Sequence, residues 1–192
     1  MKKMTALLLC ILLLFPLSAC TKKEEESQEK KANLIHAKIE VEHYGTITVE
    51  LYPDVAPKTV ENFVKLANEG FYTNSSFHRI IDGFMIQGGI NPEKKADAIE
   101  GEFTSNGFEN NLKHTPGVIS MARTSEPNSA SSQFFIMVGD ADWLDGNYAA
   151  FGKVTENLDA VYQIAKDAKP IDNNGTILPE EQPKILSVTI ID

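Results

Sequence analysis

Short alternating apolar segments, each followed by a glycine or a polar turn, restrict the fold more than any other feature of this sequence. Ile39 and Val41 alternate with polar neighbours, and Ile47, Val49 and Leu51 repeat the pattern after Gly45. A period of two predicts a hairpin with one buried face. Further short segments of this kind occur at 77–81, 84–87, 118–121, 134–138, 150–154 and 184–190.

Two segments have a helical period instead. The first begins at Pro57, places apolar residues at helical spacing as far as Ala67, and is ended by Gly70. The second passes through Leu158, Val161, Tyr162 and Ala165. About eight short strands and two helices predict a mainly β fold, a closed eight-stranded antiparallel barrel capped by the helices. The irregular stretch 89–116 is long for a compact domain, and such loops are often functional.

The first twenty residues have the pattern of an export signal. Lys2 and Lys3 precede an apolar run, Met4 to Leu17, that is shorter than the roughly 20 residues of a spanning helix. The run ends in Leu17-Ser18-Ala19-Cys20, which resembles the bacterial lipobox. That resemblance implies cleavage before Cys20, a diacylglycerol on its sulfur, and an extracytoplasmic protein anchored to the bacterial cell membrane. The alternative is an ordinary signal peptide with a chance cysteine at its end.

The next segment, 21–33, is expected to be a flexible tether between that anchor and the folded domain. Residues 21–31 (TKKEEESQEKK) include no apolar side chain, so they cannot bury enough surface to offset the entropy of ordering. A short surface helix is the alternative, because Glu, Lys and Gln are good helix formers. Residues 34–192 then form the domain itself.

Charge and motif content exclude several classes of function. The formal net charge of −9 disfavours a phosphate backbone, so we expect no nucleic-acid partner. The four His and two Cys lack metal-ligand spacing, and the sequence has no glycine-rich phosphate loop and no GxSxG motif. None of His36, His43, His78 and His114 has an evident Ser or Cys partner for acyl transfer. We therefore expect no metal and no cofactor, and nothing demands more than a monomer.

One arginine stands out, because Arg79 lies inside an apolar strand segment and must either reach the surface or be held in a cleft. The turn at Asp82-Gly83 decides the geometry. A two-residue loop would put Arg79 and Gln87 on opposite faces of the hairpin. A three-residue loop at 81–83, with Gly83 at positive φ, would pair residue 79 with residue 85 and place Phe77, Arg79, Met85 and Gln87 on one face. We predict the odd-length loop or a bulge, and the common face would then suit a neutral, partly apolar, carbonyl-rich ligand such as a peptide.

Several motifs in one order resemble those of the cyclophilins. They are FHRIIDGFMIQGG at 77–89, SMA at 120–122, NSASSQFFI at 128–136, WLDG at 143–146 and FGKV at 151–154. The resemblance covers nearly all of 34–192 and implies a peptidyl-prolyl cis-trans isomerase without a cofactor, acting on proline-containing exported polypeptides to assist their folding. It implies Arg79 as the catalytic arginine. The substrate-binding residues that it implies are Phe84, Met85, Gln87, Ala122, Arg123, Gln133, Phe135, Trp143, Leu144 and Tyr148. Trp143 matches the tryptophan with which the family contacts cyclosporin.

Some assignments stay open at this point. Phe134 and Phe135 alternate on one strand, and parity cannot say which faces the core. The predicted pairing puts Phe84 and Met85 on different faces of the hairpin, so only the resemblance places Phe84 in the pocket. Tyr148 stands where many cyclophilins have His, and there we expect altered affinity or cyclosporin sensitivity rather than lost activity. Arg123 stands where Asn is commoner, and little changes if that position acts through its backbone. A non-catalytic peptide-binding module or holdase is the alternative function, against which the presence of Arg79 favours the enzyme.

Overall fold

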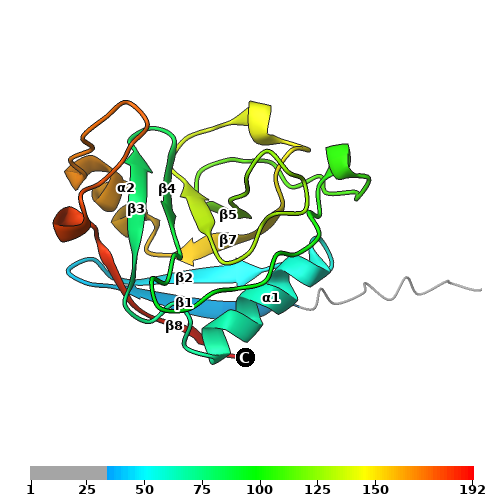
Figure 1. Cartoon of the computed structure of the whole chain (residues 1–192), viewed down its shortest axis with the longest axis horizontal. Helices are drawn as coiled ribbons and strands as arrows, with labels where there is room; N and C mark the ends of the chain where they lie inside the picture. Colours follow the sequence, from blue (N-terminus) through cyan, green and yellow to red (C-terminus); the bar gives the residue numbers. More distant parts are fainter. Residues whose placement is uncertain (1–33) are drawn as a thin grey trace, which may run out of the picture. The chain divides into compact units, whose positions relative to one another are not determined.

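The computed structural model describes residues 34–192, in which eight antiparallel strands close into a barrel in the order β1-β2-β7-β5-β6-β4-β3-β8 (Figure 1). The strands are β1 (Ile35–Val41), β2 (Gly45–Leu51), β3 (Ser75–Ile81), β4 (Met85–Gly88), β5 (Val118–Met121), β6 (Phe134–Met137), β7 (Ala150–Glu156) and β8 (Lys184–Ile190). The predicted closed eight-stranded barrel with two helices is confirmed. The proposed signal peptide (1–20), tether (21–33) and lipidation site at Cys20 lie outside the described residues.

Alternation places one face of each strand inside the barrel. β1 and β2 pair without interruption from Ile35 opposite Leu51 to Val41 opposite Gly45. Ile39 and Val49, on these two strands, are completely buried. The hairpin predicted from the period of two therefore forms with the expected face inward.

Helix α1 (Pro57–Asn68) begins and ends where the sequence predicts, but its cap comes from far along the chain. The carboxylate of Glu102 accepts hydrogen bonds from the backbone N–H of Lys58 (3.0 Å) and of Thr59 (2.8 Å). A negative group there satisfies otherwise unpaired N–H donors and interacts favourably with the positive end of the helix dipole. The irregular stretch 89–116 is thus pinned to the start of α1 by a fully buried side chain.

The interior, which we call the barrel core, is closed by both helices. Phe63 of α1 packs its ring against Phe151 and Phe134, with centroids 5.4 Å and 5.6 Å away. Helix α2 (Leu158–Asp167) contributes Val161 and Ile164, which are also fully buried. Figure 1 shows α1 and α2 on opposite sides of the strands. Within residues 34–192 no helix is long and apolar enough to cross a lipid bilayer.

The β3–β4 hairpin has the odd-length loop that the sequence analysis required. Ile81 pairs with Met85 and Arg79 with Gln87, so three residues, 82–84, form the loop, and Gly83 has a φ of 73°. The loop lies one residue later than predicted, and the partner of Arg79 is Gln87 rather than Met85. Arg79, Met85 and Gln87 nevertheless share one face, as predicted, because the loop length stays odd.

The prediction for Phe77 is wrong. The β3–β4 register shifts between Phe77 and Arg79, so a bulge separates these two residues. A bulge adds one residue to a strand and reverses the alternation beyond it. Phe77 therefore points into the barrel core, fully buried beside Phe134.

Candidate active site

The outer face of four neighbouring strands supplies the floor of a cleft. The register places Arg79 of β3 opposite Gln87 of β4, Gln87 opposite Phe135 of β6, and Phe135 opposite Ser120 of β5. Residues that are directly opposite one another point to the same side of a sheet. These four side chains thus form one row across the sheet, although Arg79 and Phe135 are 56 positions apart in the sequence.

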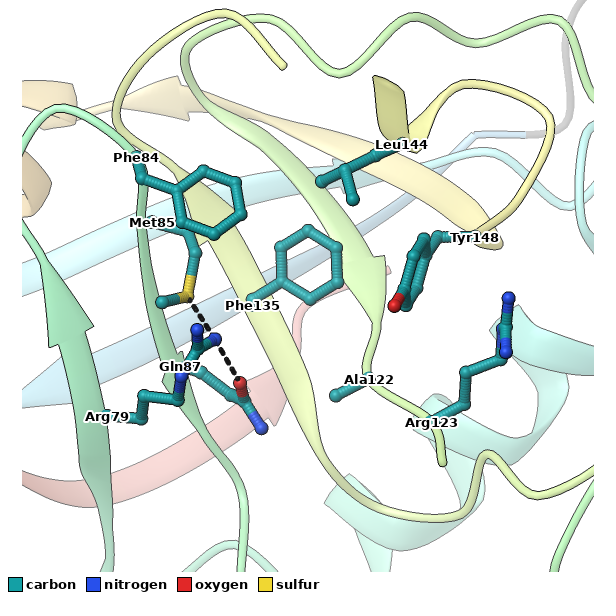
Figure 2. A pocket seen from close by; sticks show the side chains of 9 residues that line it. All are labelled: Arg79, Phe84, Met85, Gln87, Ala122, Arg123, Phe135, Leu144 and Tyr148. Atoms are coloured by element: carbon teal, nitrogen blue, oxygen red, sulfur yellow. Dashed lines mark hydrogen bonds between the residues drawn. The ribbon is translucent and has the colours of Figure 1, made fainter. Parts of the chain in front are cut away.

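Loops build the walls around this floor (Figure 2). Phe84 comes from the β3–β4 loop, Leu144 ends the short helix η2 (Asp142–Leu144), and Arg123 follows β5. The cleft has a volume of about 200 Å³, less than a drug-sized site, and suits one ring rather than a nucleotide. Its lining residues are Arg79, Phe84, Met85, Gln87, Ala122, Arg123, Phe135, Leu144 and Tyr148.

The other two substrate-binding residues that the resemblance implied lie beside this cleft. Gln133 lines an adjoining hollow of about 120 Å³ with Thr124, Ser129 and Ser131. Its amide oxygen accepts a hydrogen bond from Gln87 Nε2 (3.0 Å). Trp143 is 63% exposed, and its ring lies 5.8 Å from that of Phe84. The structure therefore brings together all eleven of the residues named from the sequence.

A second apolar group, which we call the cleft cluster, lies beneath this pocket. It consists of Met85, Val118, Phe135, Met137, Ala141, Leu144 and Ala150. Phe135 belongs to it, whereas Phe134, the preceding residue on β6, belongs to the barrel core. The register of β6 therefore decides which of these two residues faces the core, a question that strand alternation alone left open.

Three hydrogen bonds from two of its nitrogens fix the guanidinium of Arg79. Nε donates to the backbone carbonyl of Asn174 (2.8 Å), and Nη1 donates to Gln87 Oε1 (3.1 Å) and lies 3.6 Å from Met85 Sδ (Figure 2). None of the hydrogen bonds within residues 34–192 uses Nη2. The planar fork is therefore held by two of its nitrogens, while the third can donate to a ligand.

Arg123 braces the opposite wall. Its guanidinium carbon lies 4.6 Å from the centroid of the Tyr148 ring and 4.9 Å from that of Phe103, close enough for cation–π contacts. Nε and Nη2 both donate to the carbonyl of Asn147, at 3.1 and 2.8 Å. These contacts join the loop after β5 to the loop after η2, and Tyr148 stands between them.

A buried hydrogen-bonded chain, Asp145–His114–Ser120, lies behind Phe135. His114 Nδ1 is 3.0 Å from Asp145 Oδ1, and His114 Nε2 is 3.0 Å from Ser120 Oγ. Burial lowers the pKa of His114 despite the neighbouring carboxylate, so the ring is neutral at neutral pH. A neutral ring donates through Nδ1 to Asp145 and accepts at Nε2 from Ser120.

The sequence did not make this chain evident: Ser120 is only six residues from His114, but Asp145 lies 31 residues beyond it. The chain does not give any histidine a serine partner placed for acyl transfer. Ser120 is fully buried and His114 is 2% exposed, so no substrate reaches the hydroxyl for acyl transfer. The ring of His114 instead stacks on Phe135 at an interplanar angle of 19°, and so supports the cleft from behind.

The hydrogen bonds around Asp145 oppose the effect of its burial. Burial acts to raise the pKa of its carboxyl, but the bonds from the His114 backbone and ring and from Lys113 together hold that pKa below its usual value. Asp145 is therefore an anion at neutral pH that ties the η2 turn to the segment before β5. Residues 34–192 contain no group of three or more His, Cys, Asp or Glu side chains placed to hold a metal ion.

A closed antiparallel barrel with an apolar cleft, a fixed guanidinium and several amide and backbone groups defines a class of protein that binds peptides. Comparisons with known proteins make the class specific. The family model described as "Cyclophilin type peptidyl-prolyl cis-trans isomerase/CLD" matches residues 36–190. The chain therefore belongs to the cyclophilin family, and it is a peptidyl-prolyl cis-trans isomerase.

Individual relatives agree with this membership. The chain is 40% identical over 157 residues to peptidyl-prolyl cis-trans isomerase B of Escherichia coli, covering 77% of this chain and 95% of that protein. It is also 40% identical over 159 residues to an isomerase of Arabidopsis thaliana, covering 77% of this chain, but it spans only 30% of that longer protein.

A solved structure shows the same fold. The cyclophilin-type isomerase of Cryptosporidium parvum superimposes with a TM-score of 0.71 at 28% identity, covering 83% of this chain and 98% of that one. The same parasite protein was also solved in the presence of the dipeptide Ala-Pro, with a TM-score of 0.69 at 29% identity, covering 82% of this chain and 99% of that one.

Proposed function

We propose that the cleft holds the proline ring of an X-Pro segment while Arg79 stabilises the twisted peptide bond, and that the substrates are exported polypeptides. The observation that carries this proposal is the guanidinium of Arg79, which is fixed by Asn174 and Gln87 at the edge of an apolar pocket with Nη2 unpaired within residues 34–192. That geometry supplies a donor beside a ring-sized apolar site.

The chemistry needs a donor of this kind. Rotation about a peptide bond destroys amide resonance and has a barrier of about 18–20 kcal/mol. The planar nitrogen has no available lone pair, whereas the twisted nitrogen can accept a hydrogen bond. A guanidinium N–H directed at this nitrogen therefore binds the transition state more tightly than the ground state. A preorganised donor in a site shielded from water contributes about 3–4 kcal/mol, or roughly 10²–10³ in rate.

The apolar residues serve to hold the ring still while the other side of the bond turns. Phe84, Phe135 and Leu144 surround the ring-sized space, and Tyr148 closes it with its ring 5.9 Å from that of Phe135. The backbone N–H and C=O of Arg123 make no hydrogen bond within residues 34–192, so they are available to an extended peptide. This supports a role for residue 123 through its backbone, despite its unusual side chain.

The N-terminal segment motivates the proposed location. Two acyl chains on Cys20 would suffice for stable membrane anchoring. Residues 21–31 of the tether alone, at about 5–6 Å × √n, would reach roughly 18 Å from the surface. An isomerase held there would meet polypeptides as they leave the membrane and assist their folding. Trp143, exposed beside Phe84, is the proposed contact for cyclosporin.

Arg79→Ala tests the catalytic role. In a refolding assay limited by proline isomerisation, residues 32–192 carrying this change should lose at least about tenfold of their activity, or about 1.4 kcal/mol. Lys38→Ala, which removes an exposed cation on β1, is the matched control and should retain full activity. Equal rates for the wild type and Arg79→Ala would reject the mechanism.

Cys20→Ala tests the anchor separately. In the full chain expressed in a bacterium, the change should release the protein from the membrane fraction or leave the signal unprocessed, because no thiol remains to carry the lipid. Normal cleavage with unchanged membrane retention would contradict lipidation at Cys20.

A further inference from the structure

The loop 171–177 lies against β3 at the position of Arg79. Ile80 N–H donates to the carbonyl of Gly175 (2.8 Å), and Ile177 N–H donates to the carbonyl of His78 (3.0 Å). Thr176 pairs with Arg79 as an isolated antiparallel bridge between these two bonds. The loop thus extends the sheet by a few residues beside Arg79, and this brings the Asn174 carbonyl within 2.8 Å of Arg79 Nε.

One carboxylate organises this loop. Asp172 Oδ1 accepts hydrogen bonds from the backbone N–H groups of Asn174 and Thr176, both at 3.0 Å, and Oδ2 accepts one from Thr176 Oγ1 at 2.9 Å. The bonds from the Thr176 backbone and hydroxyl hold the pKa of Asp172 below its usual value. A carboxylate that accepts several local N–H bonds replaces regular secondary structure in fixing a turn.

Gly175 brings the loop close to β3. It has a φ of 85°, and a Cβ placed on it would lie 2.6 Å from the carbonyl oxygen of Ile80 and 2.5 Å from a carbon of the Ile81 side chain. A larger residue would displace the loop from the strand, and the Asn174 carbonyl would move with it. Both the turn and the close approach are therefore required for the bond to Arg79.

We propose that Asp172 is a positioning residue for catalysis, because its carboxylate keeps the Asn174 carbonyl on Arg79 Nε. Without that bond the guanidinium would keep only the contacts of Nη1 with Gln87 Oε1 and Met85 Sδ, and it could swing about this one nitrogen. The bond from Nε to Asn174 adds a second fixed nitrogen, which sets the plane of the guanidinium and leaves Nη2 to donate to a ligand. Asp172 itself is exposed and does not line the cleft, so it acts through Arg79. The inference rests on the proposed function of Arg79.

Asp172→Ala tests the inference in the full chain. Because one orienting hydrogen bond is lost, turnover of a short Ala-Pro peptide at saturation should fall about fivefold. The dissociation constant of the peptide should change less than about twofold, since the apolar pocket is intact. Asp172→Asn keeps one acceptor oxygen and should lose less. Asn173→Ala is the matched control, because this exposed neighbour makes no side-chain hydrogen bond within residues 34–192, and it should behave as the wild type.

A double-mutant cycle separates positioning from a merely structural role. In an Arg79→Ala background, Asp172→Ala should have no further effect on turnover, because the group that it positions is gone. An equal loss in both backgrounds, or a loss that follows weaker peptide binding, would overturn the inference. Full activity of Asp172→Ala beside a strongly impaired Arg79→Ala would overturn this inference alone, whereas full activity of Arg79→Ala would overturn the proposed function.

Discussion

The barrel core and the cleft cluster are built on the same strands and differ in what covers them. Phe134 and Phe135 are successive residues of β6, yet the first is fully buried among aromatic rings and the second, 5% exposed, forms the floor of the cleft. Helices α1 and α2 close the core, whereas the β3–β4 loop, η2 and the segment after β5 surround the cleft cluster. Strand alternation thus supplies two apolar surfaces, and the cover decides which one stabilises the protein and which one binds a ligand.

The largest expected effect is on stability, through Phe134→Ala. Phe134 contacts the rings of Phe63, Tyr72 and Phe77 and is completely buried. We expect the free energy of unfolding to fall by about 3–5 kcal/mol, as measured by urea denaturation. A loss smaller than that of Phe135→Ala would contradict the division into core and cleft.

Phe135→Ala should reduce activity more than it reduces stability. The space that it leaves opens to the cleft, so water can enter and the stability loss should be about 2 kcal/mol or less. Activity in the refolding assay should fall about tenfold or more, because the proline ring loses the floor against which it packs. Phe135→Leu, which restores most of the apolar contact, should recover part of the activity. Retention of full activity by Phe135→Ala would remove this residue from the site.

A smaller effect is expected at the wall of the cleft. Arg123→Ala removes the guanidinium between Phe103 and Tyr148 and its bonds to the Asn147 carbonyl. Exposed cation–π contacts contribute about 0.5–1 kcal/mol, so peptide affinity measured by calorimetry should weaken a few-fold with little change in thermal stability. Arg123→Lys keeps the charge but not the planar fork. If it restores full affinity, charge rather than geometry holds Tyr148.

The same comparison explains what the sequence could predict. Strands, helices and the common face of Arg79, Met85 and Gln87 follow from periodicity and turn length, which are local properties. The bulge before Arg79 that buries Phe77 leaves no local signal, and the Glu102 cap of α1 depends on a backbone position more than forty residues away. Likewise, the assignment of Phe135 to the cleft and Phe134 to the core needed either the family resemblance or the register of β6.

Parts of the site that act through backbone groups were missed for a related reason. Asp172-Asn173-Asn174-Gly175 is recognisable as a turn, but nothing in those four residues indicates that a carbonyl would meet Arg79 Nε. The Asp145–His114–Ser120 chain is similar, because three separate segments must fold before it exists. Sequence patterns locate the residues of the cleft better than the contacts that orient them.

The smallest expected effect is the pH dependence of stability that arises from His114, behind the cleft. Burial lowers the pKa of His114 in the folded state, so below about 6.5, the ordinary value, the unfolded chain binds a proton more readily than the folded one. The contribution of neutral His114 to stability is therefore complete above that pH and is lost as the pH falls toward the lowered value. His114→Gln should reduce the free energy of unfolding more at pH 7.5 than at pH 5.5, as measured by urea denaturation at both values. Because His36 and His78 titrate equally in both proteins, the difference between wild type and variant isolates His114. A difference that does not change with pH would mean that the ring supports Phe135 by packing alone.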